Sequence, residues 1–67
     1  MSKMQITKTA DGRYHVEVQD RFLDEDVDAA QILGITSGGR TVGTTAHDIL
    51  HRFDSQPIGY TMTVDYE

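Results

Sequence analysis

The residues most able to do chemistry are five carboxylates gathered near the middle of the chain. They fall within nine residues, with Arg21 as the only basic neighbour: Asp20, Asp24, Glu25, Asp26 and Asp28. Carboxylates at this density attract lysine and arginine and can take the place of phosphates for a basic protein. They equally suit the solvated start of a helix, where acidic side chains interact favourably with the positive end of the helix dipole. Both interpretations stay open, and the first makes all five residues candidates for binding a protein partner.

Two of the three histidines have a spacing that suits a metal. His47 and His51 are four residues apart, so one helix face can present both imidazoles to a zinc ion, with Asp48 or His15 as a third ligand. The chain has no cysteine and too few histidines for a closed four-ligand site. Solvated histidines on an exposed helix face are the commoner outcome, and we predict no metal and no cofactor.

One glycine-rich segment has the spacing of a phosphate-binding P-loop. Residues 34–41 read Gly-Ile-Thr-Ser-Gly-Gly-Arg-Thr, with Arg40 in the position of the essential lysine. The lysine is missing, the chain is short for a parallel sheet, and Val42-Gly43 opens no helix. We therefore predict a glycine-rich turn. None of the serines lies in a nucleophile elbow, and a chain of this size has little room for a catalytic cleft, so we predict that the protein is not an enzyme.

Size and charge narrow the class of protein. The 67 residues carry 11 acidic and 6 basic side chains, a net charge of -5, which argues against direct binding of nucleic acid. This length allows one domain, residues 1–67, with one modest core. No apolar run is long enough for a membrane span and no secretory signal follows Met1, so we expect no membrane association and a cytoplasmic location.

The elements that position these residues begin with a hairpin. Apolar and polar residues alternate along 4–9 and 14–19, a period typical of strands. A three-residue loop, Ala10 to Gly12, pairs Ile6 with Val16 and places one uniformly apolar face inside, with Gly12 in the left-handed region.

A helix and a strand are expected at the C-terminal end. Ala46, Ile49, Leu50 and Phe53 form one apolar stripe, Thr44 or Thr45 can cap the helix, and the segment 54–57 ends it. Alternation over residues 58–66 predicts a long strand with one buried face.

Residues 20–43 allow two interpretations. Leu23, Val27 and Ala30 favour a helix from about Asp24 to Leu33, with Asp24 as its cap. The alternative is a second hairpin that pairs residues 31–36 with 40–44.

Together these elements predict an α+β fold, a small two-layer domain. The N-terminal β-hairpin and the C-terminal strand share one sheet, and one or two helices cover one face. Because so small a core stabilises weakly, a homodimer stays open. The expected core is Met4, Ile6, Tyr14, Val16, Val18, Leu23, Val27, Ile32, Ile49, Leu50, Phe53, Ile58, Tyr60, Met62 and Val64.

Two segments resemble known families. Residues 29–36, Ala-Ala-Gln-Ile-Leu-Gly-Ile-Thr, look like the first helix and turn of helix-turn-helix proteins, which implies a DNA-reading helix from Ser37. The hairpin of residues 6–20 and the segment 43–50 are similar to small antitoxin domains of the HicB type, with Thr44 in place of the usual acid. That likeness implies a hairpin, a further strand, a helix and a last strand, in a non-catalytic protein that blocks a toxic RNA-cleaving partner.

We therefore expect a non-enzymatic, acidic binding or inhibitor protein that docks on a basic, nucleic-acid-handling protein, as antitoxins and phage-encoded anti-defence or anti-CRISPR proteins do. The alternative is a small helix-turn-helix-like DNA-binding regulator that uses residues 26–42. A further alternative is a structural or assembly subunit that pairs through an edge strand such as 58–66.

Overall fold

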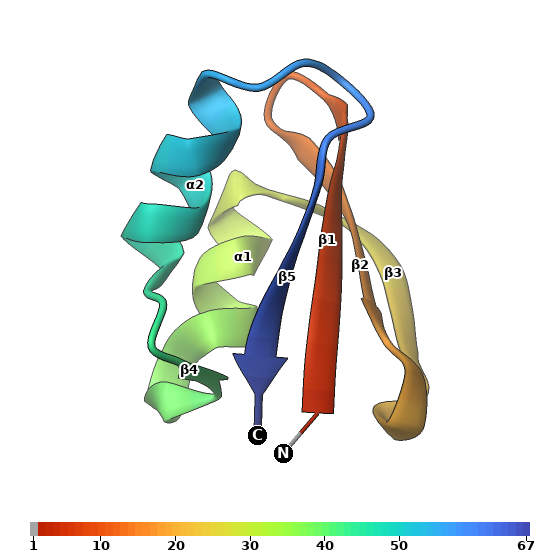
Figure 1. Ribbon diagram of the computed structural model, residues 1–67, viewed down its shortest axis with the longest axis vertical. Helices are drawn as coiled ribbons and strands as arrows, with labels where there is room; N and C mark the ends of the chain where they lie inside the picture. Colours follow the sequence, from red (N-terminus) through yellow and green to blue (C-terminus); the bar gives the residue numbers. More distant parts are fainter. Residues whose placement is uncertain (1) are drawn as a thin grey trace.

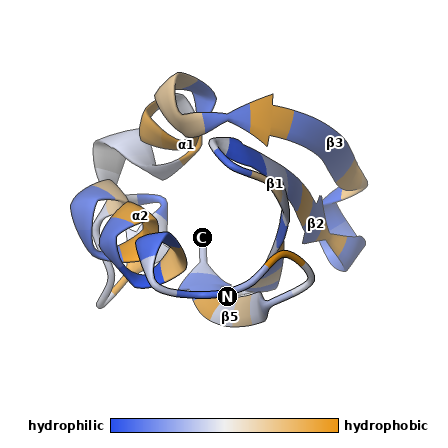
Figure 2. Cartoon of the chain, turned by 90° about the horizontal axis from the view of Figure 1, so that it is seen from above, coloured by the Kyte–Doolittle hydropathy of each residue, from blue (hydrophilic) through white to orange (hydrophobic). Residues whose placement is uncertain are grey.

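The computed structural model describes residues 2–67, which form a five-stranded antiparallel sheet and two α-helices on one face of it (Figure 1). The sheet order is β3-β2-β1-β5-β4. Seen from above, the sheet curls around the two helices (Figure 2). The predicted two-layer α+β fold is confirmed. The elements are β1 (Ser2–Ala10), β2 (Arg13–Val18), β3 (Leu23–Asp28), α1 (Ala29–Thr36), β4 (Thr41–Val42), α2 (Ala46–Asp54) and β5 (Thr61–Tyr66), with short 3-10 turns η1 (Gln19–Arg21) and η2 (Ser37–Gly39).

The N-terminal hairpin has the predicted register. Ile6 lies opposite Val16, and Met4 lies opposite Val18. Gly12 has a φ of 73°, the left-handed conformation that the short connection requires. Because strand side chains alternate, all four apolar residues are buried on the face toward the helices.

The structure corrects both interpretations of the middle of the chain. The first half of the predicted helix 24–33 is β3, which pairs antiparallel with β2. Leu23 and Val27 are four residues apart, a spacing that also puts two side chains on one face of a strand. The predicted pairing of 31–36 with 40–44 is wrong as well, because residues 31–36 are helical and β4 pairs with β5.

Helix α1 starts at Ala29 because Asp28 caps it, and the predicted cap at Asp24 is wrong. The backbone N–H of Gln31 donates to the Asp28 carboxylate at 2.8 Å, and the Asp28 N–H donates to the Gln31 side chain at 3.0 Å. This reciprocal capping box satisfies two N–H groups that the first turn leaves free. One β-strand therefore ends at the residue that begins the next helix.

Helix α2 agrees with its prediction at both ends. Thr45 and Asp48 form the expected capping box. Ile49 and Phe53 are fully buried, and the helix ends at Asp54. The ring of Phe53 lies between two tyrosines, with centroids 5.1 Å from Tyr14 and 5.8 Å from Tyr60.

The last strand, β5, is shorter than predicted. β1 flanks it along its whole length, whereas β4 pairs only with Asp65 and Tyr66, so residues 61–64 have no strand on that second side within residues 2–67. Val64 and Tyr66 are buried as one face. The prediction that Ile58 joins the core is wrong, because this side chain is 63% exposed. A turn precedes the strand, in which the N–H of Tyr60 donates to the Pro57 carbonyl at 3.2 Å.

One hydrophobic cluster forms the core, and it includes Tyr66, which was not predicted there. Leu23, Leu50, Tyr60 and Met62 are only partly buried around it. Among residues 2–67, no helix has the length and the apolar character needed to cross a membrane. The fully buried side chains are Met4, Ile6, Val16, Val18, Val27, Ile32, Ile49 and Phe53.

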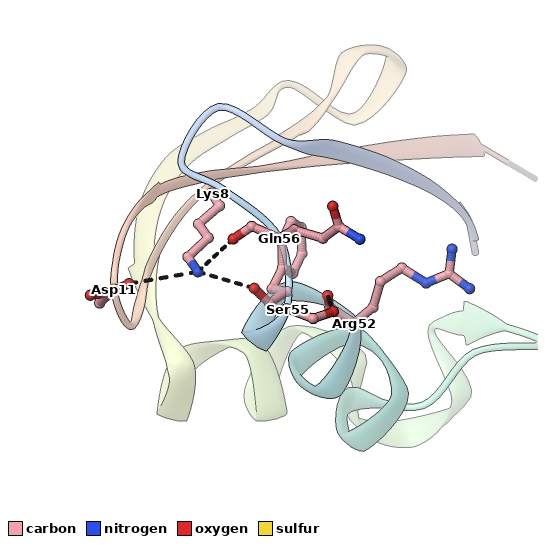
Figure 3. Close-up of polar contacts among 6 residues, drawn as sticks. Lys8, Asp11, Arg52, Ser55 and Gln56 are labelled. Carbon is pink, nitrogen blue, oxygen red and sulfur yellow. Dashed lines mark hydrogen bonds and ion pairs between the residues drawn. The ribbon is translucent and has the colours of Figure 1, made fainter.

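A lysine also lies on the buried face of β1. The Lys8 ammonium donates to the backbone carbonyls of Phe53 at 3.0 Å and Gln56 at 2.9 Å, and it lies 3.6 Å from the Asp11 carboxylate (Figure 3). A cation at a helix C-terminus satisfies free carbonyls and interacts well with the dipole. Lys8 therefore links the hairpin to the end of α2.

Candidate functional site

The candidate site is the polar face of the sheet, opposite the face that the helices cover. Strand alternation places Asp24, Asp26 and Asp28 of β3 on this side, and the β2 residue opposite Asp24 is Glu17. We call these four residues the outer acidic face. Asp28 is opposite Arg13, so the net charge at that end of the strand is smaller.

The five predicted binding residues do not share one surface. Three of them belong to the outer acidic face, but Glu25 lies on the opposite side of the same strand, across from buried Val16. Asp20 lies in η1, where it accepts a hydrogen bond from the Ser2 hydroxyl at 2.8 Å. A helix would have grouped Asp24, Glu25 and Asp28, whereas the strand separates Glu25 from the other two.

A histidine lies within the outer acidic face. The imidazole of His15 has Nε2 at 2.8 Å from the Asp24 carboxylate and Nδ1 at 2.9 Å from the Asp26 carboxylate. Only the doubly protonated ring can donate through both nitrogens. The two carboxylates therefore favour the charged imidazolium and hold β3 against β2 on the solvent side.

The charges around His15 alter its protonation. The hydrogen bond with Asp26 raises the pKa of His15 above its usual 6.5. Burial lowers this pKa, and the negative charges of Asp24, Asp26 and Glu17 raise it. Because the side chain is 37% exposed, solvent screens these interactions, and the ion pair contributes little to stability.

The outer edge of β3 has no neighbouring strand within residues 2–67. In an antiparallel ladder successive residues turn their main-chain groups to opposite sides, so some N–H and C=O groups of β3 face solvent. Acidic side chains on an edge strand discourage pairing with a second neutral or acidic strand. The same charges leave the edge accessible to a basic partner.

The other candidates from the sequence do not assemble into a site. The His47 and His51 rings are nearly parallel, with centroids 6.3 Å apart. Within residues 2–67 no group of three or more His, Asp or Glu side chains is placed to hold a metal ion. The segment 34–41 has no P-loop geometry, because it is divided among α1, η2 and the start of β4.

A hollow with a volume of about 570 Å³ lies beside α2. It is open to solvent, and the Asp, His and Arg side chains that line it are exposed, so it does not enclose a small ligand. The lining residues are Gly43, Thr44, Asp48, His51, Arg52, Asp54, Ser55 and Met62.

The structure also differs from the helix-turn-helix resemblance. A recognition helix would begin near Ser37, but Ser37–Gly39 is the short turn η2 and the next residues form β4. The second α-helix starts only at Ala46 and packs on the sheet through Ile49 and Phe53. A strand after the hairpin does agree with the topology that the HicB-type resemblance implies.

Comparison with known proteins finds no family model, no curated protein and no solved structure that matches this chain. The candidate site therefore depends on geometry alone. Reasoning from the sequence missed Glu17 and His15 as members of the site. The sequence shows that His15 and Glu17 alternate with Val16 and therefore share one face of β2. Their acidic neighbours on β3 follow only from the pairing of β3 with β2.

Proposed function

We propose that this protein is a non-enzymatic binding module that docks its outer acidic face on a basic, nucleic-acid-handling protein and so inhibits it. The observation that carries the proposal is the placement of Asp24, Asp26 and Asp28 on the solvent side of an edge strand. A rigid row of carboxylates there can compete with nucleic-acid phosphates for lysine and arginine and can steer association over a distance. We further propose that it acts in the cytoplasm, which cell fractionation can test.

Charge reversal on the two faces of β3 tests this proposal. The double variant Asp24→Lys, Asp26→Lys reverses two charges on the outer acidic face. Glu25→Lys reverses one charge on the opposite face of the same strand, and Asp24→Lys alone gives a single reversal on the outer acidic face to compare with it. The partner is first captured from the native host and purified. We expect the double variant to weaken its binding by more than about tenfold at low salt, with a loss that shrinks as salt screens the charges.

The Glu25→Lys variant is the matched control and should stay within about threefold of the original protein, because its charge points away from the partner. Thermal melting of each variant checks that the fold is retained. Equal binding by the double variant and the original protein, at low and at high salt, would overturn the proposal.

A helix-turn-helix regulator is the second candidate function, and its only support is the likeness of residues 29–36. A gel shift with random duplex DNA at low salt distinguishes the two. A DNA-binding protein retards the duplex, and the effect fades as salt rises. We expect no retardation, because like charges face the DNA over the whole outer acidic face.

A further inference from the structure

The end of the β2–β3 hairpin carries an aromatic side chain that the described fold does not use. Phe22 is 95% exposed, and its φ of 54° lies in the left-handed region. A bulky residue in this conformation is rare and strained, and glycine or asparagine would fit the turn better. Packing within residues 2–67 therefore gives no reason for a phenylalanine at this position.

The turn that carries Phe22 is fixed to the rest of the sheet. The Ser2 hydroxyl donates to Asp20 at 2.8 Å and accepts from Arg21 Nε at 3.4 Å, which joins η1 to the start of β1. The N–H of Phe22 points to the Gln19 carbonyl at 3.4 Å. The ring is thus presented from a supported turn, and binding would cost less entropy of ordering than from a free loop.

A small hollow of about 240 Å³ adjoins this ring. The apolar lining residues with exposed surface are Phe22 and Leu23, and the acidic ones are Glu17 and Asp24. The complete lining is Glu17, Val18, Gln19, Phe22, Leu23 and Asp24. An apolar surface with acidic groups beside it suits a side chain that is apolar along its length and positive at its tip.

The charges at the hollow favour a cation. Glu17 and Asp24 are directly opposite each other on adjacent antiparallel strands, where like charges destabilise the pair. Asp24 contacts His15, but none of the ion pairs found within residues 2–67 includes Glu17. The His15 imidazole offsets part of this repulsion, and a positive group from outside would relieve the rest.

We propose that Phe22, Glu17 and Asp24 together bind an arginine side chain of the protein partner. A guanidinium stacks on an aromatic face and donates in a fork to carboxylates, and its aliphatic stem can cover the hollow. The compact ammonium of lysine pairs with carboxylates but lacks the planar stacking surface. This inference rests on the proposed function and adds the identity of one contact that the partner supplies.

The test uses hexa-arginine, hexalysine and the uncharged hexacitrulline as probes of the 15N-labelled protein at low salt. We expect hexa-arginine to shift the amide signals of residues 17–19 and 22–24, and to bind about fivefold more tightly than hexalysine. Fivefold corresponds to about 1 kcal/mol of stacking energy. Hexacitrulline should cause no shifts.

Two substitutions distinguish stacking on the Phe22 ring from attraction to the carboxylates alone. Phe22→Ser should lower hexa-arginine affinity about fivefold, whereas Leu33→Ser, which removes another exposed apolar side chain, should leave it unchanged. If Phe22→Ser has no effect but hexa-arginine still shifts the outer acidic face, this inference is overturned and the proposed function stands. No shift anywhere on β2 or β3 would overturn both, and equal affinity for hexalysine would overturn the assignment to arginine.

The melting temperature, measured without any peptide, tests the premise that the fold does not need the Phe22 ring. Because the exposed Phe22 ring does not stabilise the fold, Phe22→Gly and Phe22→Asn should melt no lower than the original protein. A clear fall in melting temperature for both variants would show that the ring stabilises the fold, and would overturn the inference.

Discussion

Lys8 shows how one polar residue can hold two elements together. It occupies an inward position of β1, yet its ammonium reaches two carbonyls at the end of α2 (Figure 3). Burial of a charge is costly unless it is hydrogen-bonded and paired, and here the Asp11 carboxylate lies nearby at 3.6 Å.

Replacing Lys8 by methionine tests this role. The substitution keeps the volume of the stem but leaves the carbonyls of Phe53 and Gln56 without a donor, so we expect a loss of about 1–3 kcal/mol in the free energy of unfolding. Urea denaturation measures it. Lys3→Met is the control, since Lys3 forms an exposed ion pair with Asp65 whose removal should cost less than about 1 kcal/mol. Similar losses in the two variants would contradict the proposed role of Lys8.

The His15 contacts predict a pH dependence of stability. The folded pKa is raised above 6.5, so the contribution of His15 is fully present below pH 6.5 and is lost as the pH rises through the folded value. Glu17, Asp24 and Asp26 favour the proton, and Arg13, on the same face of β2, opposes it. Relative to His15→Gln, the original protein should therefore lose stability over this range, by no more than about 1 kcal/mol.

Denaturation of both proteins at several pH values on either side of the folded pKa of His15 measures the difference. A 1H–15N titration of the His15 ring gives the folded pKa directly. A stability difference that is flat with pH, or a pKa at or below 6.5, would contradict the arrangement of His15 between the two carboxylates.

At the scale of elements, two capping boxes set where the helices begin. Asp28 and Thr45 each accept a hydrogen bond from the backbone N–H three residues later, at 2.8 and 3.2 Å. Asp28 has a second role, because its carboxylate also belongs to the outer acidic face. Stability and binding can therefore be separated at this residue.

Three substitutions make the separation. Asp28→Asn keeps a good cap and removes the charge, so stability should change by less than about 0.5 kcal/mol while binding to the basic partner weakens. Thr45→Ala removes only a cap and should cost about 1 kcal/mol with unchanged binding, and Asp28→Ala should show both effects. Denaturation curves and partner titrations measure them. A large stability loss in Asp28→Asn would show that the negative charge itself is needed at the helix start.

At the scale of the whole molecule, the charge distribution follows from the sheet order. β3 is an edge strand of six residues, and its carboxylates repel a second copy of the same strand. On the other side of the sheet, β4 has only two residues and leaves residues 61–64 of β5 without a neighbouring strand within residues 2–67. We therefore expect the acidic edge, β3, to oppose self-association.

The variant Asp24→Thr, Asp26→Thr tests this expectation, because threonine favours strands and carries no charge. Sedimentation should show the original protein as a monomer at micromolar concentration and the variant as partly self-associated. Lys3→Thr, which removes a charge on β1 in the middle of the sheet, is the control and should stay monomeric. Association of the original protein through β3 would contradict the protective role of the acids.

Much of the fold could be predicted because its signals are local. Alternation and a turn glycine predict the hairpin, and the register that buries Ile6 and Val16 on one face is confirmed. The stripe through Ile49 and Phe53, with the Thr45 cap, predicts α2. Each of these patterns fits only one period, so no distant contact is needed to interpret it.

The acidic segment could not be assigned in this way. Leu23 and Val27 fit both a helix and a strand, and acidic residues have low strand propensity, so local preference favoured the wrong choice. The decision came from pairing with β2, which buries Val27 and satisfies the backbone of the segment, while the Asp28–Gln31 box starts the helix later than expected.

The sequence by itself therefore determined that the segment 20–28 is strongly acidic and that the fold has two layers, since charge and short-range periodicity are properties of the chain alone. Only the tertiary structure decided which carboxylates share a surface, that His15 lies between two of them, and that Glu17 and Phe22 adjoin one hollow. The physical reason is that pairing between strands decides which side chains, far apart in the sequence, become neighbours on each face of the sheet.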